Sequence, residues 1–231
     1  ANTNNDPSAE LTPTELCARI STLHDKIKND VESIENTRNE KRQLDADTTT
    51  ALWQKLVAQI GFDRLTRSND IKKEISDLQA MTKNKKEQRV LSDFDVKVNN
   101  LFATYRSDVD KSLATYKTTY DTLNLARFDN EDALIAKYKA DSLTALEASQ
   151  KSCTEGTYGE VERSALKDKL KEYAETLKAG DEQSKIDSVL TDKKIDEANT
   201  LKNTQIDEAN KIFTENFKLA KEKLISDLAE K

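Results

Sequence analysis

The sequence predicts an all-α protein, namely an elongated antiparallel helical bundle or coiled coil with long helices. The first observation is that only four of the 231 residues are Gly and two are Pro, whereas globular domains average about 7% Gly and about 5% Pro. Too few turn residues remain for a sandwich, a barrel or a doubly wound sheet. The second observation is that large apolar residues recur at steps of three and four, the spacing of a helical seam. No apolar run approaches the ~18 residues of a membrane span.

The first predicted helix follows a polar stretch, residues 1–11, which we expect to be a flexible tail. The helix starts at Thr12, which suits the N-cap, with Pro13 at the first helical position and Glu15 as the reciprocal acid of a capping box. We expect a break at 61–63, where Gly61 interrupts the pattern. The first seam consists of Leu16, Ile20, Leu23, Ile27 and Ile34, and resumes with Leu44, Leu52, Leu56 and Ile60.

A second helix is predicted over 68–89, and Ser92 to Asp95 resembles another capping box at the start of a third helix. A second seam then runs at steps of three and four toward the main reversal, which we place at 154–159 because two of the four glycines lie there. This seam consists of Phe94, Val98, Leu101, Tyr105, Val109, Leu113, Tyr116, Tyr120 and Leu123.

The last part of the chain is predicted to contain a short helix over 161–177, a C-cap or kink at Gly180, and an eleven-residue repeat over 195–231. The motif Ile-Asp-Glu-Ala-Asn occurs there twice, and eleven residues over three turns keep one face of a helix nearly straight. The repeats begin at Ile195, Ile206, Phe217 and Leu228, and the first three form the third seam. We treat 12–231 as one elongated bundle.

Cys17 and Cys153 are the two cysteines, and they leave two readings open. They form one disulfide in a secreted or secretory-granule protein, or they are two buried free thiols in a cytosolic protein. The sequence begins at Ala1 without Met, so we expect either that a signal or pro-segment has been removed or that the sequence starts inside a longer gene. We favour the disulfide on that basis.

The residues that carry chemistry indicate no enzyme. His24 is the single histidine, and two helical turns separate it from Cys17, too far for a direct hydrogen bond. The four glycines form no phosphate-binding loop, and no acidic group fits an EF-hand. We therefore expect no cofactor, although acidic groups on neighbouring molecules are candidates for weak Ca²⁺ binding. The densest groups are Asp93/Asp95, Asp108/Asp110 and Asp129/Glu131/Asp132.

The charge balance constrains the partners. The net charge is −6, from 37 basic and 43 acidic residues, so we expect no nucleic-acid partner, which would need a basic face. The basic stretch 64–89 and the acidic stretch 93–132 suit antiparallel pairing of helices or staggered contacts between molecules. A lipid surface is a weaker candidate, because the apolar residues form a face narrower than surface-lying helices favour.

These features together resemble the matrix proteins of ciliate secretory granules, the trichocyst and mucocyst lattice polypeptides. The resemblance rests on composition and periodicity over most of the chain. It implies proteolytic maturation, assembly into a matrix and Ca²⁺-linked expansion. We therefore expect a structural coiled-coil protein that self-assembles with itself or with related helical proteins; the alternative is a secreted lipid- or small-ligand-binding bundle of the apolipoprotein kind.

Overall fold

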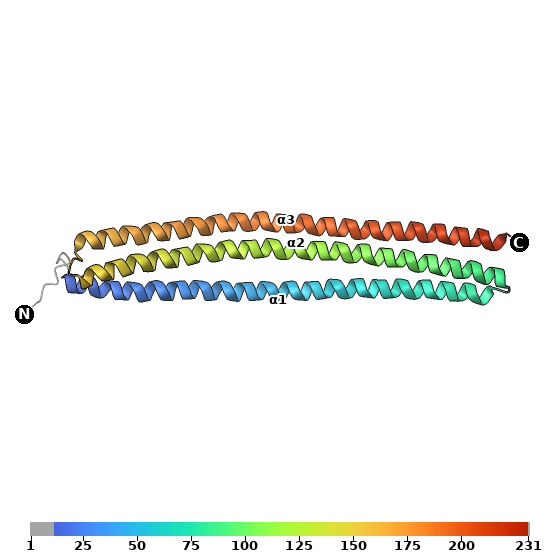
Figure 1. The fold of residues 1–231 in the computed structure, drawn as a ribbon, viewed down its shortest axis with the longest axis horizontal. Helices are drawn as coiled ribbons and strands as arrows, with labels where there is room; N and C mark the ends of the chain where they lie inside the picture. Colours follow the sequence, from blue (N-terminus) through green and yellow to red (C-terminus); the bar gives the residue numbers. More distant parts are fainter. Residues whose placement is uncertain (1–11, 231) are drawn as a thin grey trace, which may run out of the picture. The chain divides into compact units, whose positions relative to one another are not determined.

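The computed structural model describes residues 12–230 and consists of three long α-helices (Figure 1). They are α1 (Pro13–Met81), α2 (Lys85–Thr154) and α3 (Glu160–Ala229), and the described residues contain no strand. The all-α class predicted from the sequence is confirmed. The tail expected at 1–11 lies outside the described residues.

The chain divides into two compact units. Unit 1 comprises Ala1–Asp45 with Leu125–Thr191, and unit 2 comprises Ala46–Asn124 with Asp192–Lys231. Each unit contains a segment of all three helices, so each is a three-helix bundle with its own core. No Pro- or Gly-rich linker marks the boundaries, which fall inside continuous helices.

The start of α1 has the capping box that the sequence predicted. The Thr12 backbone N–H donates to Glu15 Oε2 at 2.8 Å, and the Glu15 N–H donates to Thr12 Oγ1 at 3.3 Å. These two bonds satisfy backbone donors that a helix leaves without partners at its first turn.

The first reversal lies at 82–84, and the break expected at 61–63 is wrong. α1 continues through Gly61 to Met81, so the predicted helix start at 68 and the capping box at 92–95 are also wrong. Asn84 caps α2 instead: its Oδ1 accepts from the Glu87 N–H at 3.0 Å, and Glu87 Oε2 accepts from the Lys83 N–H at 2.7 Å. A single glycine costs a helix about 1 kcal/mol, which the packed residues on both sides of Gly61 outweigh.

The second reversal lies between Thr154 and Glu160, as the sequence predicted. Gly156 has a φ of 72°, and two hydrogen bonds close a Schellman motif around it: Gly156 N–H to the Cys153 carbonyl at 3.1 Å, and Thr157 N–H to the Ser152 carbonyl at 2.9 Å. The expected helix end or kink at Gly180 is wrong, because α3 runs through it without a break.

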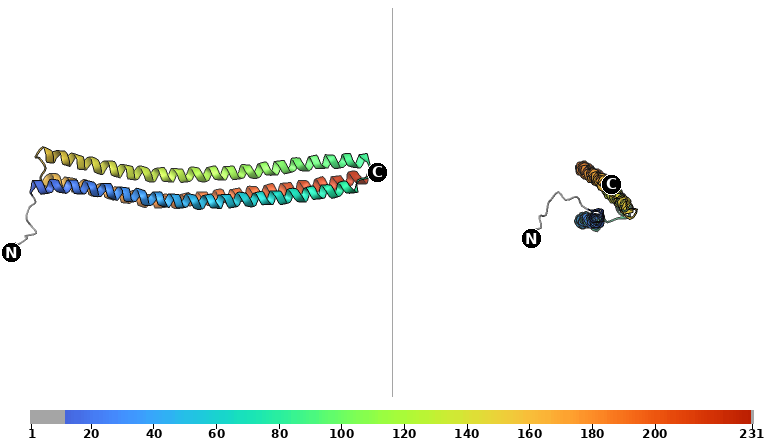
Figure 2. Two further views of the ribbon diagram at one scale, coloured as in Figure 1. Left: turned by 90° about the horizontal axis from the view of Figure 1, so that it is seen from below. Right: turned by 90° about the vertical axis from the view of Figure 1, so that its left-hand side faces the viewer.

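Contacts along each unit define the direction of the helices. In unit 1, Cys17 on α1 meets Cys153 on α2, and Arg42 further along α1 meets Asp132, which comes earlier in α2. In unit 2, Arg67 on α1 lies over Phe213 on α3, and Glu74 further along α1 pairs with Lys221 further along α3, so these segments of α1 and α3 run in parallel. Within each unit, the segment of α2 lies between the other two in Figure 1 and to one side of both in Figure 2, which is a triangular arrangement.

No helix within residues 12–230 is long and apolar enough to cross a membrane.

Candidate functional site

The first predicted seam forms much of the core of unit 1. Leu16 is 4% exposed, Ile20 1% and Ile27 7%, and Ile34 packs beside them. Leu23 lies at the rim with 36% exposure, and Leu44 and Leu52, expected to continue the seam, are exposed. Val31 is fully buried in the same core, although it was not among the predicted seam residues.

The second and third seams pack against each other in unit 2. Phe94, Val98 and Tyr105 of α2 are buried in the same cluster as Phe213 of α3. The Phe94 and Phe217 rings lie 6.2 Å apart between centroids. Leu101, Tyr116, Tyr120, Ile195 and Ile206 are half-buried. Most of the predicted seam residues therefore pack the interior of the units, and Leu23, Leu44 and Leu52 are the exposed exceptions.

The eleven-residue repeat of α3 places three residues per repeat on the inner face, at successive steps of three, four and four. The first position holds Ile195, Ile206 and Phe217, and the second holds Ala198, Ala209 and Ala220. The third position holds Lys202, Phe213 and Leu224, all of which are buried.

Lys202 is therefore a charged residue at a core position. Its side chain is 6% exposed, its Nζ lies 4.8 Å from the centroid of the Tyr116 ring, and it donates to Asn199 Oδ1 at 2.8 Å. Burial lowers the pKa of Lys202 and raises the pKa of Tyr116. The ammonium is held by an aromatic face and one amide oxygen.

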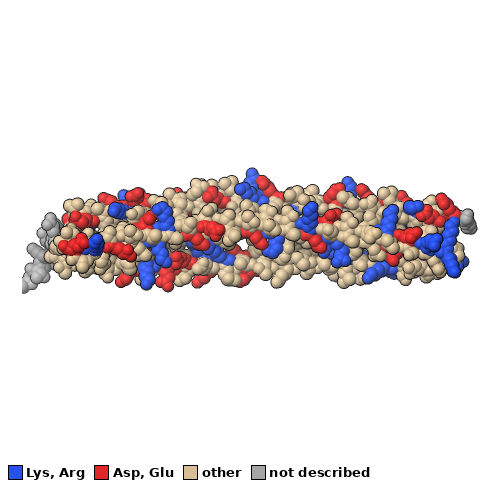
Figure 3. Space-filling model, in the orientation of Figure 1, with Lys and Arg blue, Asp and Glu red and all other residues tan. Residues whose placement is uncertain are grey.

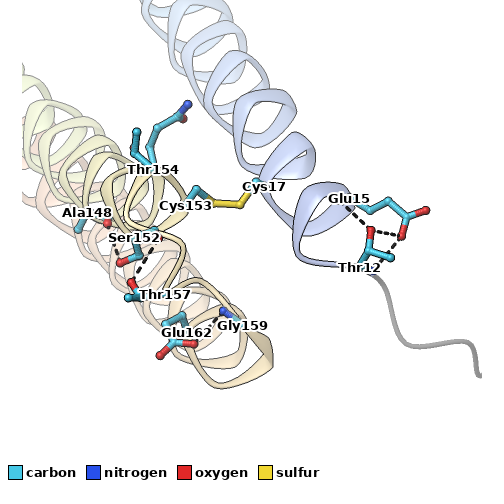
Figure 4. The surroundings of a disulfide bond; sticks show 11 residues. Thr12, Glu15, Cys17, Ala148, Ser152, Cys153, Thr154, Thr157, Gly159 and Glu162 are labelled. Carbon is cyan, nitrogen blue, oxygen red and sulfur yellow. Dashed lines mark hydrogen bonds between the residues drawn. A yellow bond between two sulfur atoms is a disulfide. The ribbon is translucent and has the colours of Figure 1, made fainter.

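Cys17 and Cys153 form a disulfide in unit 1, with an S–S distance of 2.07 Å and a Cα–Cα distance of 5.8 Å. The bond joins the first turns of α1 to the last turn of α2 (Figure 4). Of the two readings that the sequence left open, the structure has the bonded one.

His24 and the acidic groups form no metal centre within the described residues. His24 Nδ1 lies 3.7 Å from Asp25 Oδ1, and both side chains are substantially exposed. No group of three or more His, Cys, Asp or Glu residues in the 12–230 range is arranged to hold an ion. Two of the three acidic groups instead face arginines. Asp110 pairs with Arg64 at 2.6 Å, and Glu131 and Asp132 pair with two arginines of α1.

Arg38 and Arg42 of α1 form a charged cluster with Glu131 and Asp132 of α2 in unit 1. Arg42 donates to both carboxylate oxygens of Asp132 at 3.0 Å and to Glu131 Oε2 at 3.2 Å, and Arg38 pairs with Asp132 as well. Hydrogen bonds from Arg42 and Arg38 lower the pKa of Asp132, although its partial burial acts in the opposite direction. The Arg42 guanidinium lies 4.5 Å from the centroid of the Phe128 ring.

A cavity of about 610 Å³ opens beside this cluster, and it lies entirely within unit 1. Residues of all three helices line it, among them Ile34 and Arg42 of α1, Phe128 of α2 and Leu177 of α3. A smaller cavity of about 420 Å³ lies near the disulfide, between Leu16 and Leu166.

The surface carries both signs of charge, and red and blue side chains are interspersed on the face shown in Figure 3. Part of the basic stretch 64–89 turns toward the helices beside it. Arg64 pairs with Asp110, which is the predicted contact between basic and acidic stretches, and the Arg67 guanidinium lies 4.7 Å from the Tyr105 ring centroid.

Sequence reasoning missed the arginines at inner positions. The predicted first seam has no member between Ile34 and Leu44, whereas Arg38 and Arg42 are half-buried in this interval. The signal was present in the spacing, because Val31, Arg38 and Arg42 continue the steps of seven and four from Ile27. A guanidinium was not considered as a core residue, although its stem and planar face pack well on aromatic rings.

Comparison of the chain with family models, with curated proteins and with solved structures gave no match.

Proposed function

We propose that the protein is a structural component that associates with copies of itself or with related helical proteins in an oxidising compartment, such as a secretory granule. The observation that carries the proposal is an exposed apolar stripe on α3 in unit 2. Leu201 is 54% exposed, Ile212 45% and Leu219 59%. Steps of eleven and seven residues return to nearly the same side of a helix, so these side chains share one face.

Single exposed leucines are common on proteins, but apolar residues aligned along a helix form a surface suited to another helix. The stripe is self-complementary, because a two-fold axis would place it against its own copy. The net charge of −6 opposes this contact. Cations therefore favour it by screening, and Ca²⁺ bridging between acidic faces of neighbouring molecules is the stronger form of that effect.

The Cys17–Cys153 bond supports the compartment, because disulfides persist in secreted proteins and are rare in the cytosol. The proposal assigns no catalytic role to His24 and no cofactor.

The test is the mass of the oxidised protein in solution by light scattering, measured in NaCl, in MgCl₂ and in CaCl₂ at equal ionic strength. We expect a mass above the 26.1 kDa of one chain, rising with salt and rising most in CaCl₂. The variant Leu201→Gln/Ile212→Gln/Leu219→Gln should remain monomeric. The control variant Leu65→Gln/Val96→Gln/Val161→Gln replaces three apolar residues elsewhere that are on average more exposed than the stripe, and it should associate as the wild type does. A monomeric wild type in all three salts would contradict the proposal.

A further inference from the structure

After Leu177, the residues on the inner face of α3 in unit 1 have small side chains. The next half-buried positions are Gly180, Ser184 and Ser188, at steps of three and four. At Gly180, α3 approaches α2 so closely that an added Cβ would lie 2.5 Å from Leu134 Cδ1. The two serines do not fill the space that a Leu or Phe would occupy, and the cavity of about 610 Å³ lies here. Its volume is that of a site for one small organic molecule.

The lining of the cavity has two chemical parts. Apolar side chains come from all three helices, with Ile34, Leu134 and Leu177 as examples. The charged lining residues are predominantly basic, six against three acidic. An apolar surface beside an excess of positive charge is complementary to an anion that has an apolar body.

Two of the basic residues remain for a ligand. Arg38 and Arg42 are occupied by Glu131 and Asp132, Lys185 pairs with Asp181 at 2.7 Å, and Arg127 donates to Ser188 Oγ at 3.2 Å. Lys41 of α1 and Lys178 of α3 also line the cavity and form no ion pair among residues 12–230.

We propose that this cavity binds one amphiphilic organic anion, such as a long-chain carboxylate. Its apolar body lies against Ile34, Leu134 and Leu177, and its head group lies between Lys41 and Lys178. Asp45, an acidic lining residue with no ion pair in residues 12–230, opposes the head group. The site belongs to unit 1 and the α3 stripe belongs to unit 2, so ligand binding does not depend on self-association through the stripe.

The test is titration calorimetry of the full oxidised chain with dodecanoate below its micelle concentration. Dodecyltrimethylammonium has the same chain with the opposite charge, and butyrate has the head group without the body. We expect binding of one dodecanoate per chain and little binding of the other two. Equal binding of the cationic amphiphile, or no binding of dodecanoate, would overturn the proposal.

Matched variants locate the site. Lys41→Gln/Lys178→Gln should weaken dodecanoate binding about tenfold, and Asp45→Asn should strengthen it a few-fold. Lys26→Gln/Lys169→Gln makes the same charge change at exposed lysines of unit 1 outside the cavity and should have no effect. Equal weakening by both lysine pairs would show that only net charge matters and would refute the site.

Ser184→Leu fills the cavity and should abolish binding while the helical circular dichroism is retained. If that variant does not fold, hydrogen exchange of the wild type decides the location. Dodecanoate should slow exchange in 34–45 and 177–188 and leave unit 2 unchanged. Protection confined to unit 2 would contradict the proposal.

Discussion

Removal of the Cys17–Cys153 bond should destabilise unit 1 selectively. The bond joins residues 136 positions apart, so in the oxidised protein it restricts the unfolded chain over more than half of its length. In the chain-entropy model, closing a loop of this size is worth about 5 kcal/mol at 25 °C. The variant Cys17→Ser/Cys153→Ser loses this contribution.

The division of the chain into two units slightly lowers this estimate of the contribution of the disulfide to stability. If unit 2 stays folded while unit 1 opens, the flexible part of the loop comprises only the α1 and α2 segments of unit 1. The entropic contribution is then about 4 kcal/mol, because loop entropy varies only with the logarithm of length. For a chain of this size, 1 kcal/mol corresponds to about 2–4 °C in Tm. A fall of about 10–15 °C is therefore expected for the transition of unit 1.

The assay combines thermal unfolding by far-UV circular dichroism with hydrogen exchange by mass spectrometry. Exchange should accelerate in 13–45 and 125–191 and change little in 46–124 and 192–229. Wild type treated with a reductant serves as the control and should behave like the double variant. An unchanged Tm, or faster exchange confined to unit 2, would refute the reasoning, and free thiols in non-reduced protein would show that the bond is absent.

Four further substitutions test the packing by their effect on the free energy of unfolding, measured by urea titration. Lys202→Met should stabilise the protein by about 1 kcal/mol at pH 7, because the lowered pKa of Lys202 means that folding disfavours its charge. Between the folded pKa of Lys202 and its ordinary pKa of 10.5, the unfolded state binds more protons than the folded state. The wild type therefore gains stability as the pH rises through this window, and the stability advantage of Lys202→Met shrinks. An advantage that grows with pH would contradict this reasoning. Asp132→Asn should cost about 1 kcal/mol at neutral pH. Because the folded pKa of Asp132 is lowered, this cost should disappear as the pH falls from 3.8, the ordinary pKa of an Asp carboxyl, through the folded pKa; a cost independent of pH would exclude the ion pair as its cause. Gly61→Ala should stabilise by about 1 kcal/mol, since no atom lies within 4 Å of the added Cβ, whereas Gly180→Val should destabilise by about 1–3 kcal/mol against Leu134; equal effects of the two would refute the difference in packing.

The sequence predicted the helices better than their ends. Helical periodicity and the glycines at 156 and 159 were sufficient to place the second reversal. The first reversal was missed because residues 82–84 contain neither Gly nor Pro, and Gly61 was taken for a break that the structure does not have. The spacing of Asn84 and Glu87 is that of a capping box and was the available signal.

The cavity and the charged cluster could not be predicted from the pattern of apolar residues. Both arise where the inner positions hold Arg38, Arg42 and Ser184, and a search for apolar seams passes over polar residues. Their contacts depend on which residues of α1, α2 and α3 lie opposite one another. The alignment of the three helices depends on the lengths of the two reversals, and the periodicity of apolar residues does not predict these lengths.

The repeat in α3 has a consequence for how this helix finds its place. Its inner face carries the same residue types at the first two positions of the repeats that begin at Ile195 and Ile206. A slip of α3 by eleven residues along its neighbours would therefore exchange Ile for Ile and Ala for Ala. Between these two repeats only the third position differs, because the slip would move Phe213 into the place of Lys202 beside Tyr116. Lys202, which weakens the core, thus helps to distinguish the native alignment from one shifted by eleven residues, and a helix with Phe at 202 would lack this difference between the two repeats.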